Sequence, residues 1–169
     1  MVLAAIGLLL SLGVHLMALA GLPIPGGSIV WGLHIGIFIV WVPTVLVSQR
    51  MTRQTSRRDF WREGLRGCPP WMRTVVYVFA GYAFLNFAVF LISTVGQPKP
   101  TGAAPPSVIR GFSGHWMLFY SAAFATLYSA IHDGDVLRDR HCPRGHVVFT
   151  QRHFCPDCGA RMESEGRDA

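Results

Sequence analysis

The first 49 residues, MVLAAIGLLLSLGVHLMALAGLPIPGGSIVWGLHIGIFIVWVPTVLVSQ (1–49), contain no Asp, Glu, Lys or Arg. A membrane-spanning helix needs roughly 20 apolar residues to cross a hydrocarbon core about 30 Å thick. The stretch is therefore long enough for two crossings, and Pro23, Pro25, Gly26 and Gly27 predict a turn between them. This stretch decides the fold class, because uncharged helices of this length lack a face suited to water.

Two further uncharged tracts follow, at 74–98 and 111–132. With the first tract they predict four spans, at about Met1–Leu22, Ser28–Val47, Thr74–Val95 and Phe112–Ile131. The fourth span is the least apolar, because it contains Ser113, His115, Ser121, Thr126 and Ser129. We predict an all-α polytopic membrane protein with a four-helix transmembrane bundle in residues 1–132. A water-soluble helical bundle is the alternative, and it would need a solvated face that these tracts do not provide.

The basic residues predict the orientation. Seven of the fifteen Lys and Arg lie between Arg50 and Arg73, six lie between Arg138 and Arg167, and the loop after the third span has only Lys99 and Arg110. The positive-inside rule then places the basic loop 49–73 and both termini in the cytoplasm, in a plasma membrane of bacterial type. Alternatively, the first span is a signal peptide cleaved near Ala18–Gly21, although it has no basic residue at its start. Cleavage would leave the orientation of the other spans unchanged.

The C-terminal stretch CPRGHVVFTQRHFCPDCG (142–159) has four residues of metal-ligand type in the spacing C-x3-H-x8-C-x2-C. A tetrahedral zinc ion needs two close ligand pairs that a reversal of the chain brings together. The residues from Val147 to Phe154 predict a small β-hairpin that folds the second pair onto the first. Gly145 and Gly159 occupy positions where tight turns around sulfur favour glycine.

The FCPDCG half resembles the knuckle of zinc-ribbon domains, and CPRGH resembles the variant in which His replaces the second Cys of the first knuckle. The resemblance covers residues 142–159 and is specific for metal binding, not for an activity. It implies a Cys3His zinc ribbon at 141–160, after a linker at 133–140 and before a polar tail at 161–169. The implied Zn²⁺ ligands are Cys142, His146, Cys155 and Cys158.

Some alternatives remain open for this motif. His141 or His153 could replace His146 as the ligand, and Cys155 and Cys158 could form a disulfide, although a reducing cytoplasm disfavours structural disulfides. An iron centre of rubredoxin type would favour four thiolates over this set. Four protein ligands indicate a closed structural site rather than a catalytic one.

The loop RMTRQTSRRDFWREGLRGCPPWMR (50–73) combines seven Arg with aromatic residues. A short helix could turn Phe60, Trp61 and Leu65 toward the membrane and leave the arginines in water, as in an interfacial segment on anionic lipid. The predicted lipid-interface residues are Arg57, Arg58, Trp61, Arg62 and Arg66. Alternatively, these arginines only set the topology.

Three histidines lie inside the predicted spans, His15, His34 and His115. Ionisable residues at membrane depth suggest a function, here a pocket for haem, metal or quinone. Alternatively, neutral histidines form hydrogen bonds across helices, which the absence of Asp and Glu from the spans favours. Gly7, Ser11, His15 and Ala18 form one helical stripe of small and polar residues, which should face another helix.

The sequence contains no nucleophile elbow, P-loop, dinucleotide fingerprint or HExxH motif. Residues 132–169 have six Arg and seven acidic residues, a balance that argues against nucleic-acid binding. We predict a non-enzymatic accessory or assembly subunit of a membrane complex, whose zinc ribbon docks to a membrane-protein partner or to a second copy of the chain. The alternatives are a membrane redox or transport protein that uses the three histidines and a membrane-tethered regulator.

Overall fold

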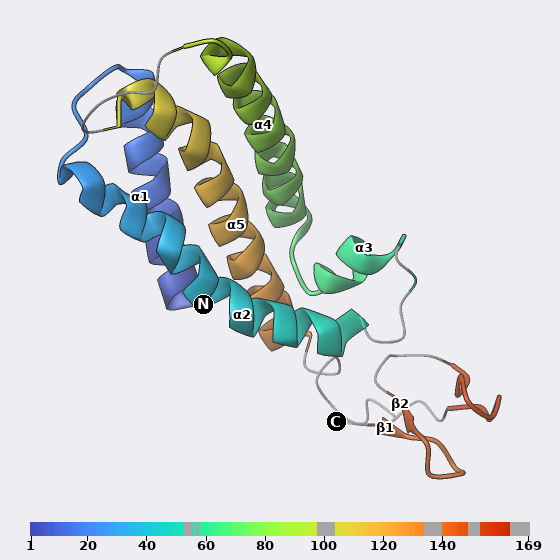
Figure 1. The fold of residues 1–169 in the computed structure, drawn as a ribbon. Helices are drawn as coiled ribbons and strands as arrows, with labels where there is room; N and C mark the ends of the chain where they lie inside the picture. Colours follow the sequence, from blue (N-terminus) through green and yellow to red (C-terminus); the bar gives the residue numbers. More distant parts are fainter. Residues whose placement is uncertain (53–55, 57, 98–103, 134–139, 149–152, 163–169) are drawn as a thin grey trace.

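The computed structural model describes residues 1–52, 56, 58–97, 104–133, 140–148 and 153–162. Four long helices form a bundle (Figure 1). They are α1 (Val2–Leu19), α2 (Gly32–Thr52, preceded by the 3-10 turn η1, Gly27–Trp31), α4 (Pro70–Thr94) and α5 (Pro106–His132). The short helix α3 (Phe60–Gly64) lies between α2 and α4, and two short strands follow α5, β1 (Arg140–His141) and β2 (Val147–Val148).

Successive long helices run in opposite directions (Figure 1). One end of the bundle, called here the His132 end, therefore contains the start of α1, the end of α2, the start of α4 and the end of α5. The other end, called the Pro106 end, contains the connections from α1 to α2 and from α4 to α5. Helix α3 lies at the His132 end.

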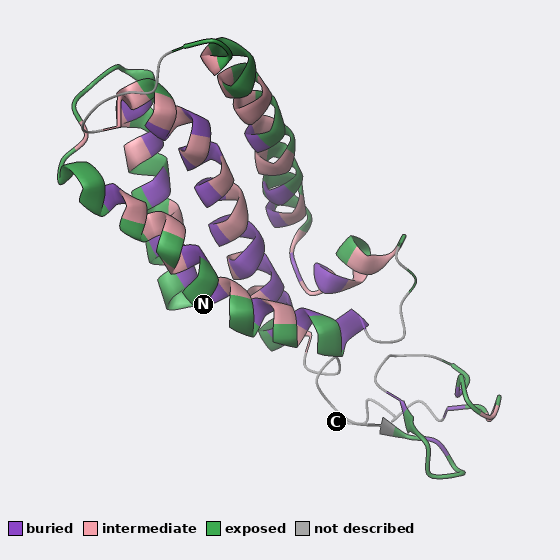
Figure 2. Ribbon diagram, in the orientation of Figure 1, coloured by how far each residue is buried: buried purple, intermediate pink, exposed green. Residues whose placement is uncertain are grey.

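Helix α5 is the central helix, because it packs against α1, α2 and α4. Most of this helix is buried or half-buried (Figure 2). Between Val108 and Ala130 none of its residues is exposed, and Trp116 is completely buried. Its buried polar residues are Ser113, Ser121, Thr126 and Ser129. Because these side chains meet other helices, this helix can be less apolar than its neighbours without exposing polar groups.

The three surrounding helices are apolar on their exposed faces. Phe84 and Ile92 of α4 are 74% and 77% exposed, and Ile35 and Phe38 are exposed on α2. Water would penalise such a surface, whereas lipid would not. The segments Val2–Leu19, Gly27–Thr52 and Pro70–Thr94 are long and apolar enough to cross a membrane. The chain is a mostly helical protein with the features of a membrane protein.

The observed helices extend beyond several predicted spans. Helix α4 begins at Pro70 rather than Thr74, and α5 begins at Pro106 rather than Phe112. In both cases a proline occupies the first turn, where its missing N–H costs no helical hydrogen bond. Helix α2 continues to Thr52. Pro69 is the N-cap residue of α4, and Pro70 is its first residue.

Small residues allow Tyr120 of α5 to pack closely against α1 and α2. The buried residues of α1 are Ala4, Gly7, Ser11, His15 and Ala18, which confirms the predicted stripe. A Cβ atom at Gly7 would overlap the Tyr120 ring, and one at Gly36 would lie 2.5 Å from the Tyr120 hydroxyl. That hydroxyl donates a hydrogen bond to the carbonyl oxygen of Leu33 at 2.7 Å. Tyr120 therefore joins α1, α2 and α5.

Candidate metal centre

Two tight turns of similar construction present the ligand-type residues. In the first turn the N–H of Cys142 donates to the carbonyl of His146 at 3.0 Å, and the N–H of Gly145 donates to the carbonyl of Cys142 at 2.8 Å. Gly145 has φ +82°, a conformation that side chains disfavour. The flanking strands β1 and β2 pair in antiparallel fashion, with His141 opposite Val147. This hairpin holds Cys142 and His146 on one turn.

The second turn repeats this arrangement around Cys155. Its N–H donates to the carbonyl of Ala160 at 2.8 Å, and the N–H of Gly159 donates to the carbonyl of Cys155 at 2.9 Å, with Gly159 at φ +69°. In the described residues Val147 and Val148 pair with β1, and Phe154 pairs with Arg161 through a single bridge. The middle of the predicted Val147–Phe154 hairpin, 149–152, lies outside the described residues, so this hairpin stays a prediction.

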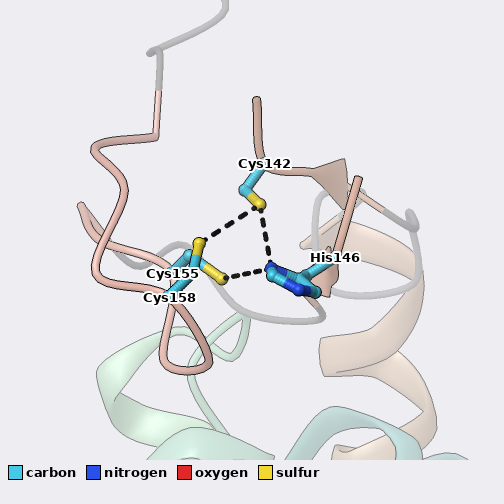
Figure 3. A group of neighbouring side chains, drawn as sticks. All are labelled: Cys142, His146, Cys155 and Cys158. Carbon is cyan, nitrogen blue, oxygen red and sulfur yellow. Dashed lines mark hydrogen bonds between the residues drawn. The ribbon is translucent and has the colours of Figure 1, made fainter. Parts of the chain in front are cut away.

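The two turns bring together all four predicted ligands (Figure 3). Their ligand atoms lie within 4.8 Å of one another. The Sγ atom of Cys142 lies 3.5 Å from Nδ1 of His146 and 3.7 Å from Sγ of Cys158, and Sγ of Cys155 lies 3.8 Å from the same Nδ1. A tetrahedral zinc ion with bonds of about 2.3 Å to sulfur and about 2.0 Å to nitrogen separates its ligand atoms by about 3.5–3.8 Å. The cluster therefore has the dimensions that such an ion requires.

The cluster lies beside a small core of its own. Cys142, Val148, Cys155 and Met162 are buried together, and Cys158 and Ala160 pack against them. All four cysteines of the chain are free thiols. His141 and His153 are exposed and do not belong to the group of converging ligand atoms. The structure thus selects His146 among the three histidines of this region.

The surroundings of the thiols favour one thiolate. Burial opposes ionisation of Cys142, but hydrogen bonds from the backbone of Arg144 and His146 and from the other thiols outweigh it and lower the pKa of Cys142 to about 6. For Cys158, a backbone hydrogen bond from Ala160 favours the thiolate, but burial and the neighbouring Cys142 thiolate raise its pKa. A bound cation would reverse this effect, since a metal ion stabilises every thiolate that it coordinates.

The structure places the histidines of the long helices in separate contacts. Ser113 donates its hydroxyl hydrogen to the carbonyl of Arg110 at 3.2 Å, so its oxygen can accept Nδ1–H of His15 at 2.7 Å. The Nε2 atom of His15 then accepts a hydrogen bond from the Tyr82 hydroxyl. This relay joins α4, α1 and α5 through a neutral imidazole.

His34 and His115 have other neighbours. The indole N–H of Trp116 donates to Nδ1 of His34 at 3.0 Å, and the His115 ring contacts Phe87 edge-to-face. Within the described part of the chain, His15, His34 and His115 do not form a group of converging ligand atoms. Sequence reasoning missed Tyr82, although its spacing of four residues from Asn86 indicated a shared polar face on that helix. Asn86 donates to the carbonyl of Arg110 at 2.7 Å.

The predicted lipid-interface residues have different environments. Arg57 lies outside the described residues. Arg58, Trp61 and Arg62 are exposed. Arg66 instead forms ion pairs with Glu63 at 2.9 Å and with Asp133 at 2.7 Å. Its role is to join α3 to the end of α5.

Fold and site together define a helical protein of membrane type whose C-terminal Cys3His cluster can hold a metal ion. No family model, curated protein or solved structure matches the chain. The likeness to zinc ribbons thus rests on the residues of the two turns and on their geometry.

Proposed function

We propose that α5 is a fourth membrane span and that both termini lie in the cytoplasm of a bacterial-type plasma membrane. At 27 residues, α5 is about 40 Å long, more than a hydrocarbon core of about 30 Å requires. Its polar side chains are shielded by the other helices. The basic loop and the basic residues after α5 are both connected to the His132 end, which suits the positive-inside rule.

Reporter fusions test this topology. One reporter is fused within the loop after Thr52 and another after Ala169, and the reporter fluoresces only in the cytoplasm. Both fusions should fluoresce, which would place both sites in the cytoplasm. Opposite sides for the two fusions would show that α5 does not cross the membrane, and an outside location for both would reverse the orientation.

The cluster is proposed to bind Zn²⁺ in a structural, non-catalytic role. Three thiolates and one imidazole match zinc in ligand type, and the separations of their atoms match its tetrahedral geometry. Four protein ligands complete the coordination and leave no open position for water or substrate. Zinc at this site would supply folding free energy to a unit whose own apolar core is very small.

The proposed function is that of a non-enzymatic accessory or assembly subunit, whose Cys3His module docks to a membrane-protein partner or a second copy of the chain. The observation that carries it is this closed cluster on a small module that exposes Phe154 (58%) and Val147 (36%). Large apolar side chains on so small a unit suit protein contact. The relay at His15 assigns that residue to helix packing, which favours this function over a redox or transport role for the histidines.

The decisive experiment separates docking from metal binding. Phe154→Asp changes an exposed side chain outside the ligand set, so this variant should keep one zinc per chain and lose its partner when purified after gentle solubilisation. Arg144→Gln, an exposed change in the first turn, is the control and should keep the partner. A wild-type chain that purifies as a lone monomer, or a Phe154→Asp variant that keeps the same assembly, would contradict the proposal.

A further inference from the structure

The segment between α3 and α4 has a fixed place at the His132 end of the bundle. Leu65 is completely buried and packs with Cys68, Met72 and residues of α5. The N–H of Gly67 donates to the Ser129 hydroxyl at 2.9 Å, and the Cys68 thiol donates to the carbonyl of Ala125 at 3.0 Å. The expectation that Leu65 faces the membrane is therefore wrong, since this side chain anchors the segment to the bundle.

Two tryptophans that flank this segment are exposed. Trp61 in α3 is 46% exposed, and Trp71, the second residue of α4, is 64% exposed. Helix α4 has 25 residues and is about 37 Å long, a few ångströms more than a hydrocarbon core of about 30 Å. This extra length allows Trp71, in the first turn, to lie at the depth of the lipid headgroups, where the amphipathic indole ring is favoured.

The arginines in and around this segment differ in how their charge is neutralised. Arg66 is occupied by Glu63 and Asp133. Arg73 donates to two backbone carbonyls, those of Cys68 at 3.0 Å and Arg66 at 2.6 Å, which carry no net charge. Arg62 lies 3.9 Å from Asp59 with its side chain 76% exposed, a pair that water screens. Neither Arg58 nor Arg73 forms an ion pair with a carboxylate in the described part of the chain.

We propose that this aromatic and basic surface, defined as Arg58, Trp61, Arg62, Trp71 and Arg73, binds the phosphate headgroups of anionic phospholipids. Guanidinium groups form paired, charge-assisted hydrogen bonds with phosphate oxygens. The anchoring of Leu65 and Cys68 holds the surface beside the start of α4, at headgroup depth. Anionic lipid therefore gathers around this surface in preference to zwitterionic lipid. This proposal does not depend on the docking role of the Cys3His module.

Lipid nanodiscs of the full-length, zinc-loaded chain provide the test. The nanodiscs contain about 20% phosphatidylglycerol in phosphatidylcholine. In one sample brominated phosphatidylglycerol replaces the phosphatidylglycerol, and in the other an equal amount of brominated phosphatidylcholine replaces phosphatidylcholine. Bromine quenches nearby indole fluorescence, and a Trp61→Phe/Trp71→Phe variant provides the background from the other three tryptophans. We expect the brominated anionic lipid to quench the Trp61 and Trp71 signal at least about twofold more than the brominated zwitterionic lipid. Both leaflets are equivalent in a nanodisc, so insertion direction has no effect.

Charge variants show whether the arginines cause the preference. In the triple variant Arg58→Gln, Arg62→Gln and Arg73→Gln, both brominated lipids should quench the tryptophan fluorescence equally. The same should hold for the wild type in about 0.5 M salt, where the Debye length falls to roughly a few ångströms and salt screens the arginines. Arg110→Gln removes one charge near the opposite end of the bundle and should keep the preference. Arg73 also donates to backbone carbonyls, so its substitution could change the local structure. The double variant Arg58→Gln and Arg62→Gln leaves these contacts in place and should lose most of the preference for anionic lipid. Equal quenching in the wild type, or an unchanged preference in both charge variants, would overturn the proposal.

Discussion

The ring of Tyr120 on α5 occupies the place that a Cβ atom at Gly7 on α1 would need. The same tyrosine reaches across Gly36 to the carbonyl of Leu33 on α2. One aromatic side chain thus sets the approach of three helices. The close fit requires glycine at position 7 because glycine has no side chain, and not because the backbone there has an unusual conformation.

Replacing Gly7 should therefore destabilise the bundle. Gly7→Val forces the Tyr120 ring to move, and overpacking of this kind costs about 1–3 kcal/mol. Thermal unfolding in detergent, followed by loss of helical circular dichroism, measures the effect. Gly13→Val is the matched control on the same helix, because a Cβ atom there meets nothing within 4 Å. Equal losses for the two variants would mean that Tyr120 does not occupy the space beside Gly7.

The relay through His15 should contribute to stability through both of its hydrogen bonds. His15→Phe leaves Ser113 and Tyr82 without their partner, at a cost of about 1–3 kcal/mol. A double-mutant cycle with Tyr82→Phe should give a coupling free energy of about 0.6 kcal/mol or more, as for hydrogen bonds between membrane helices. His115→Phe replaces a ring whose Nδ1 is buried without a partner among the described residues, so it should cost less. Additive effects of the His15 and Tyr82 substitutions would contradict the relay.

The ion pairs of Arg66 should fasten α3 to the end of α5. Arg66→Gln leaves the partly buried carboxylates of Glu63 and Asp133 without a cation and should lower the free energy of unfolding by about 1 kcal/mol. Asp133→Asn in the same chain should recover part of this loss, since it removes one unpaired charge. Arg62→Gln, whose partner is distant and exposed, is the control and should have little effect. Chemical denaturation in mixed micelles provides the free energies.

Metal removal should unfold the Cys3His module and leave the bundle intact. The core of the module, Cys142, Val148, Cys155 and Met162, is a cluster separate from those of the long helices. A strong chelator should make the chain after His132 sensitive to protease, while helical circular dichroism stays nearly unchanged. Re-addition of zinc should restore protection. Cooperative loss of the helical signal on chelation would show instead that the bundle depends on the metal.

The mostly helical, membrane-type character of the chain could be predicted from the sequence, because its tracts without charge are long. The Cys3His cluster of Cys142, His146, Cys155 and Cys158 could be predicted because Cys and His at short spacing constrain their own turns. The central position of α5 could not be predicted. Hydropathy alone does not show whether a less apolar helix is shielded by other helices or exposed to lipid. The pairing of β1 with β2 was missed because two-residue strands have no periodicity to detect. Leu65 was misplaced because a spacing pattern on a five-residue helix does not identify which neighbour its apolar side meets.

X-ray absorption at the zinc edge, together with metal analysis of the purified chain, is the most direct test of a closed zinc site at the Cys3His cluster. We expect one zinc per chain, with three sulfur ligands at about 2.3 Å, one nitrogen ligand at about 2.0 Å and no oxygen ligand. His146→Ala should weaken this binding, whereas His141→Ala and His153→Ala should leave the spectrum unchanged. A chain purified without metal, a coordinated water, or a Cys155–Cys158 disulfide in place of the ion would contradict a closed structural zinc site.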